Sequence, residues 1–124
     1  MVKKWNVLFM KEGNSEFNVD TALLSRLFET TDEVSEKEEA LRLLENKTYD
    51  IVIADLTVNP ERLGFLKQLQ DLKTEQCIFA LVAEKDTDKL YGIADMGIHA
   101  FELNASQLEQ ALEVIANFDP YSEH

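Results

Sequence analysis

Segments typical of strands alternate with segments of helical spacing along the whole chain, and this alternation constrains the fold more than any other feature. The clearest strand is IVIA at 51–54, where four consecutive apolar residues lie between Asp50 and Asp55. A run that is apolar at every position is typical of a strand buried on both faces. Further strands are expected at 5–10, 31–34, 77–83 and 99–103.

Between the expected strands, apolar residues recur at intervals of three and four, as they do on one face of a helix. Two of these helices begin with SEKE (35–38) and SQLE (106–109), which predict capping boxes. Gly97 is expected to end the fourth helix in the left-handed conformation. The expected helices cover 19–30, 35–46, 60–72 with Pro60 at the first helical position, 86–94, and a last segment from 106 onward.

The order strand–helix, repeated five times, predicts an α/β fold in which a five-stranded parallel sheet carries helices on both faces. A chain of 124 residues fits one domain. We expect that domain at 1–120, followed by a short tail at 121–124 and no output domain.

The amino-acid composition argues against several classes of function. The formal net charge of −12 opposes binding to the phosphate backbone of nucleic acid. No run of apolar residues approaches the roughly 20 that a membrane span needs. The apolar run near the amino terminus is too short for the core of a signal peptide. We therefore expect a soluble, cytoplasmic protein without nucleic-acid or membrane partners. The single cysteine, Cys77, begins an apolar run and is expected to be a buried structural thiol.

Ligand sites in open parallel sheets lie at the carboxyl ends of the strands. In this chain those ends carry Lys11 and Glu12 after the first strand, and Asp55 at the end of the third. The fourth and fifth strands end near Val82 and Asn104. Two carboxylates and one ammonium group are therefore expected at one edge of the sheet.

The same loops argue against several familiar α/β activities. KEGNSEF at 11–17 has one glycine, so it lacks the glycine pattern of a dinucleotide site and the Gly-Lys-Ser/Thr ending of a P-loop. A hydrolase nucleophile would need a histidine base, but His99 is expected at the opposite end of the sheet and His124 at the chain end. No His and Cys metal cluster is present in the sequence either. We expect a carboxylate site without enzymatic activity.

The whole chain resembles the receiver domain of two-component response regulators. The resemblance is carried by VLFM-KE at the first strand, EALRLL in the second helix, YDIVIADL with Asp55, NP…G after it, IFALVAE at the fourth strand and MGIHAFEL before the end of the fifth. It implies a flavodoxin-like, doubly wound (βα)5 fold with strand order 2-1-3-4-5. It also implies a role in phosphorelay signal transduction, with a sensor histidine kinase or another signalling protein as partner.

The resemblance implies specific roles at the site. The aspartate at the position of Asp55 accepts a phosphoryl group, and an acidic pair after the first strand helps it to hold Mg²⁺. A hydroxyl after the fourth strand and a lysine after the fifth then bind the acyl phosphate. Positioning and charge neutralisation supply most of the catalysis of phosphoryl transfer, which explains this set of groups.

This chain departs from the family pattern at most of those positions. The acidic pair is Lys11-Glu12, the hydroxyl position is Val82, and the lysine position is Asn104. Metal binding by Glu12 and Asp55 is expected to be weak, and Lys11 is expected to pair with Asp55. We therefore predict a degenerate receiver, or pseudo-receiver, that acts mainly through protein binding.

Further expectations concern switching and partners. Phe101 lies where the family carries an aromatic rotamer switch, although a plain core residue fits equally well. Leu90, Tyr91 and Phe101 would border a partner or dimer face formed by the fourth helix, the fifth strand and the fifth helix.

Several alternatives stay open at this stage. Asp55 alone could begin a turn, and Glu12 could be a solvated loop acid. Glu12 and Asp55 could suffice for Mg²⁺, which would make a phosphorylation-competent receiver. In a different class, the loop at 11–16 could bind a flavin or nucleotide, to which GNS is a faint match.

Overall fold

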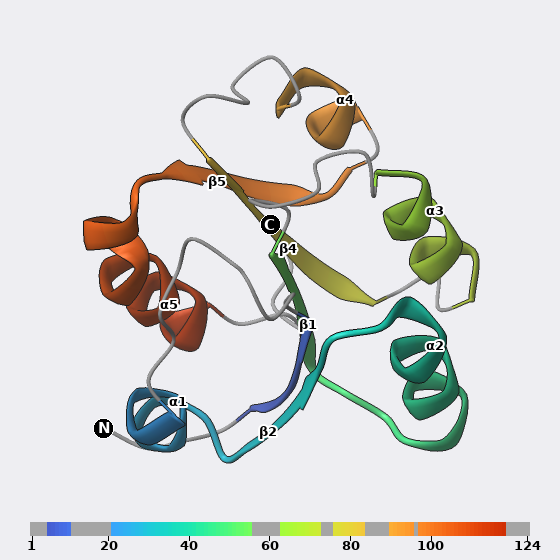
Figure 1. Ribbon diagram of the computed structural model, residues 1–124, viewed down its shortest axis with the longest axis horizontal. Helices are drawn as coiled ribbons and strands as arrows, with labels where there is room; N and C mark the ends of the chain where they lie inside the picture. The colour runs from blue at the N-terminus through green and yellow to red at the C-terminus, as the bar shows by residue number, and fades with distance from the viewer. Residues whose placement is uncertain are drawn as a thin grey trace.

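The five strands form one parallel sheet in the order β2-β1-β3-β4-β5, which confirms the predicted fold (Figure 1). The computed structural model describes residues 5–10, 21–55, 63–72, 76–83, 90–95 and 97–118. The strands are β1 (Asn6–Met10), β2 (Thr30–Val34), β3 (Ile51–Asp55), β4 (Cys77–Ala83) and β5 (His99–Leu103). The helices are α1 (Thr21–Leu27), α2 (Lys37–Asn46), α3 (Leu63–Leu72), α4 (Leu90–Asp95) and α5 (Leu108–Asn117), with a 3₁₀ turn η3 (Ala105–Gln107) before the last.

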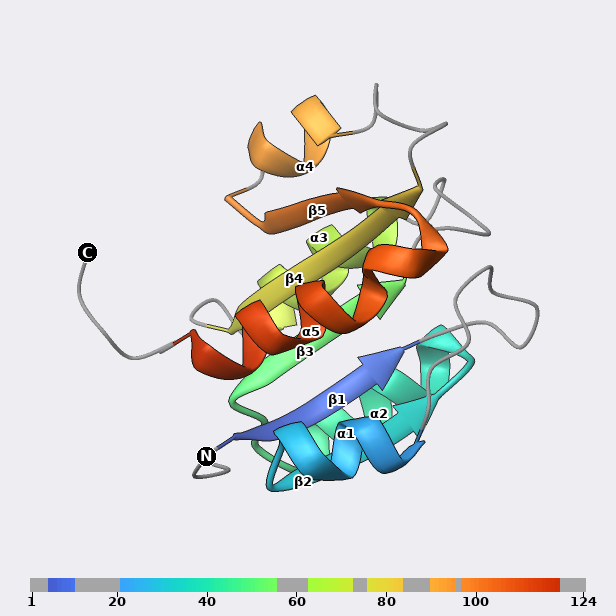
Figure 2. The same ribbon diagram turned by 90° about the vertical axis from the view of Figure 1, so that its left-hand side faces the viewer.

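Helices cover both faces of the sheet, so the core has two halves. Figure 2 shows α1 and α5 together on one face, and Figure 1 shows α2 and α3 on the other. Side chains alternate between the halves along each strand: Val7 and Phe9 of β1 pack toward α1 and α5, whereas Leu8 and Met10 pack toward α2 and α3. The central strands are therefore apolar at consecutive positions, as the sequence pattern predicts.

The first helix is shorter than predicted, because β2 begins sooner. The helix was expected to reach Thr30, but its last backbone bond runs from the Phe28 N–H to the Leu24 carbonyl. The next amide, that of Glu29, donates to the Trp5 carbonyl at 2.9 Å, at the start of the pairing between β2 and β1. Pairing with β1 replaces the helical bonds that 29–30 would make.

The predicted capping box at 35–38 is wrong. Helix α2 begins at Lys37, so Glu36 and not Ser35 occupies the N-cap position. Glu36 is extended, with φ −117° and ψ 141°, and no side chain caps this end. The SEKE motif has the required residue types, but the chain enters the helix one residue later than the motif needs.

The predicted capping box at 106–109 is also wrong, and one made by Asn104 and Gln107 replaces it. The Ser106 N–H donates to Asn104 Oδ1 at 3.0 Å, and the Asn104 N–H donates to Gln107 Oε1 at 2.9 Å. The prediction for Gly97 is confirmed, since this residue has a φ of +77°. That conformation is inexpensive for glycine alone.

Several predictions lie outside the described residues. These are the helix starts at Pro60 and at 86–87, the first residues of the helix predicted from 19, and the tail at 121–124. Within the described part of the chain, no helix has the length and apolar character needed to cross a membrane.

Candidate functional site

Asp55 is a buried carboxylate at the carboxyl end of the central strand β3. The four residues before it, Ile51 to Ala54, are almost completely buried, and Asp55 itself is only 3% exposed. Among the residues that the structure describes, Asp55 is the one buried charged side chain. Because burial of an ionised group is costly, a carboxylate is found in such a position mainly where it has a specific role.

The strand register shows which strand ends lie beside Asp55. Met10, the last residue of β1, pairs with Ala54, and Leu81 of β4 pairs with Asp55. Lys11 and Glu12, the predicted site residues after β1, lie outside the described residues. The predicted contacts of Lys11 and Glu12 with Asp55 therefore stay predictions.

Val82 lies one residue beyond the partner of Asp55 on β4 and is fully buried. It packs with Ala80 and Ile78 in the half of the core that faces α2 and α3. A valine there provides no hydroxyl, so β4 offers an apolar wall at this position.

Asn104 follows directly after β5, as predicted, but its side-chain oxygen is already engaged. Asn104 Oδ1 accepts hydrogen bonds from the Ser106 N–H at 3.0 Å and from the Ser106 hydroxyl at 2.6 Å. These bonds fix the turn η3, which leads into α5. The residue therefore has a structural role that the sequence prediction missed. The signal for it was an Asn three residues before a Gln.

Phe101 in β5 is half-buried and stacks on another ring of the core. Its ring centroid lies 5.8 Å from that of Phe79, with an interplanar angle of 16°. The packing accounts for an aromatic residue at this position, and the role of Phe101 as a switch stays a prediction.

A polar cluster that the sequence did not reveal joins β2 to the segment before β3. The carboxylate of Asp32 accepts hydrogen bonds from the Tyr49 hydroxyl and from Lys47 Nζ, the latter at 2.7 Å. The hydrogen bond from Lys47, followed by that from Tyr49, lowers the pKa of Asp32 below its ordinary value. Burial, followed by the hydrogen bond to Asp32, raises the pKa of Tyr49. The cluster lies on the edge strand and does not include Asp55.

His99 and Cys77 lie at the amino ends of β5 and β4, far along the strands from Asp55. The imidazole of His99 stacks on Phe79 with ring centroids 4.8 Å apart, and it contacts Phe118 edge-on at 5.0 Å. Cys77 was predicted to be buried but is half-buried, because it is the first residue of β4. Burial still raises the pKa of its thiol to about 11. His99 is thus part of the aromatic packing around Phe79, and Cys77 packs against the same half of the core.

The predicted Mg²⁺ ligands cannot be assembled from described residues alone. Over the described ranges, no three His, Cys, Asp or Glu side chains are grouped closely enough to hold a metal. Asp55 supplies one oxygen-bearing group of the kind that Mg²⁺ prefers, and Glu12 lies outside those ranges. Magnesium binding therefore stays a prediction.

Solved structures of other proteins share the fold of this chain. The chain is similar to a response regulator receiver domain protein from Clostridium thermocellum, with a TM-score of 0.65 and 18% identity over 90% of this chain and 94% of that chain. This chain has a receiver-domain fold. It is also similar to an adenylate cyclase from Rhodopirellula baltica, with a TM-score of 0.61 and 13% identity over 88% of this chain and 84% of that one.

At these identities the likeness concerns the fold. No protein-family model matches the sequence, and a search of curated proteins gives no match. Within this fold, Asp55 lies at the carboxyl end of the central strand β3.

Proposed function

We propose that this chain is a receiver-type domain of two-component signal transduction in which Mg²⁺-dependent phosphorylation at Asp55 is degraded. The domain would act in the cytoplasm and mainly through binding to other proteins. The observation that carries the proposal is the buried carboxylate of Asp55 at the carboxyl end of the central strand. In a parallel sheet with helices on both faces, this edge is where sites are built.

The register supports a place for Lys11 and Glu12 in the same site. Met10, the last residue of β1, pairs with Ala54, so β1 ends one residue before the position that would pair with Asp55. Consecutive Cα atoms are about 3.8 Å apart, so a site that joins Lys11 and Glu12 to Asp55 is compatible with the point at which β1 ends. In the proposed site the ammonium group of Lys11 pairs with Asp55.

The charge balance explains why magnesium would bind weakly. Three carboxylates and a lysine give a usual receiver site a charge of −2, whereas Glu12, Asp55 and Lys11 together give −1. Mg²⁺ would lose one ligand and meet a cation. At an effective dielectric constant near 20, a unit-charge contact at about 4 Å is worth about 4 kcal/mol.

The two groups that would hold an acyl phosphate are also replaced. Val82 is buried in the apolar core and has no hydroxyl to donate. The Asn104 oxygen is engaged in capping η3, and its amide carries no charge for a phosphate. Both replacements favour a domain whose conformation responds weakly to a phosphoryl group.

We expect a protein partner, such as a sensor histidine kinase or another signalling protein. The face formed by α4, β5 and α5 carries Phe101 of β5, which is half-buried, and Val114 of α5, which is 54% exposed. A second copy of the chain could use the same face to form a dimer. Of the residues predicted to border it, Leu90 and Tyr91 lie in α4.

Direct phosphorylation tests the proposal. The protein is incubated with Mg²⁺ and acetyl phosphate, and intact-mass spectrometry then measures any added phosphoryl group. In the reaction, an Asp55 carboxylate oxygen attacks phosphorus, an acyl phosphate forms and acetate leaves. We expect little or no adduct under conditions that label an intact receiver fully. An adduct lost in Asp55→Asn would show instead a competent receiver that uses Glu12 and Asp55.

Restoring variants distinguish a degraded site from an unrelated one. Lys11→Asp with Val82→Thr and Asn104→Lys would rebuild the usual set of groups around Asp55. We expect this triple variant to gain a phosphoryl group that the additional change Asp55→Asn removes. No gain in a folded triple variant would contradict the assignment of Asp55. Flavin absorbance in the purified wild-type protein would favour the alternative of a flavin-binding loop at 11–16.

A further inference from the structure

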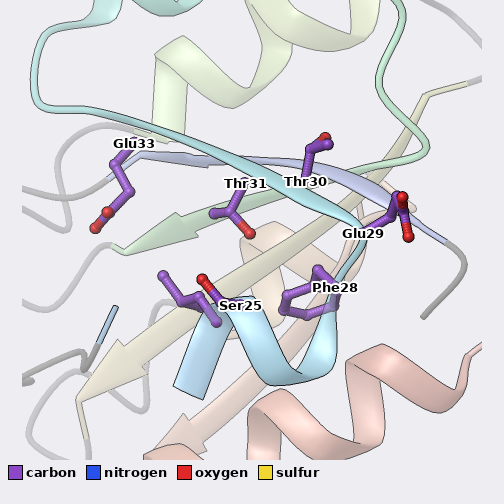
Figure 3. Close-up of a pocket in the computed structure, with 7 residues that line it drawn as sticks. Ser25, Phe28, Glu29, Thr30, Thr31 and Glu33 are labelled. Carbon is purple, nitrogen blue, oxygen red and sulfur yellow. The ribbon is translucent and has the colours of Figure 1, made fainter. Parts of the chain in front are cut away.

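We draw no further inference here: the strongest candidate, the pocket of about 320 Å³ between helix α1 and the edge strand β2 (Figure 3), carries none, because the Thr31 hydroxyl, which has no hydrogen-bond partner among the described residues, is closed even to a water molecule, and the exposed Glu29 and Glu33 beside it form an acidic cluster that no second observation connects to a ligand.

Discussion

The hydroxyl of Tyr49, in the segment before β3, donates a hydrogen bond to the carboxylate of Asp32 in β2. The two residues are 17 positions apart and join the edge strand to the connection that enters the central strand. Lys47 donates to the same carboxylate and lies 5.7 Å from the centre of the Tyr49 ring. Among the described strands, β2 pairs with β1 alone. The cluster therefore supports this edge strand in addition to its backbone bonds with β1.

Tyr49→Phe should lower the free energy of unfolding by about 1 kcal/mol, because one hydrogen bond to a carboxylate is lost while the buried ring stays. The measurement is urea unfolding followed by circular dichroism. Combined with Asp32→Asn in a double-mutant cycle, the two changes should be less than additive. Additive effects would mean that the Tyr49 hydroxyl and Asp32 do not stabilise each other.

Asp32 should also contribute to the acid sensitivity of the fold. Its pKa is lowered in the folded state, so its stabilising effect is present above the unfolded pKa of about 3.9 and is lost as the pH falls through the folded value. We expect Asp32→Asn to lose less stability than the wild type between about pH 5 and pH 2. Urea midpoints measured across this range test the expectation. Parallel curves for the two proteins would contradict it.

Cys77 should react slowly in the folded protein. Its thiol pKa is about 11, compared with about 8.5 for a free cysteine. At pH 7.5 the folded protein therefore contains less thiolate, the form that reacts, by roughly two orders of magnitude. The rate with Ellman's reagent, followed by absorbance, should rise at least that much in concentrated urea. Equal rates in the two states would show that burial does not protect this thiol.

The N-terminal ends of α2 and of the turn η3 allow a matched comparison of N-cap side chains. Asn104→Ala should lower the free energy of unfolding by about 1 kcal/mol, because the bonds to the Ser106 N–H and hydroxyl are lost. Ser35→Ala should change it by only a few tenths of a kcal/mol, because Ser35 does not cap α2. Urea unfolding of both variants tests the pair. A larger loss in Ser35→Ala would mean that the hydroxyl caps α2 in solution.

Much of the fold could be predicted, because it depends on patterns that are local in the chain. The apolar run at 77–83 gives β4 its observed bounds, and the segment at 99–103 gives β5. The resemblance to receiver domains added the strand order, which periodicity alone does not specify. For the candidate site, the sequence placed Asp55 at the end of β3, and the structure shows its burial. The roles of Lys11 and Glu12 stay predictions.

The sequence by itself determined which segments become strands and helices, and which residues stand at the strand ends, since these follow from the spacing of apolar side chains. Tertiary structure decided where α1 gives way to β2, because the Glu29 amide bonds to Trp5, 24 positions earlier in the numbering. It also brought Tyr49 to Asp32 and left Thr31 Oγ1 without a partner. Such contacts join residues far apart in the chain, so their geometry exists only after the sheet and its helices have packed.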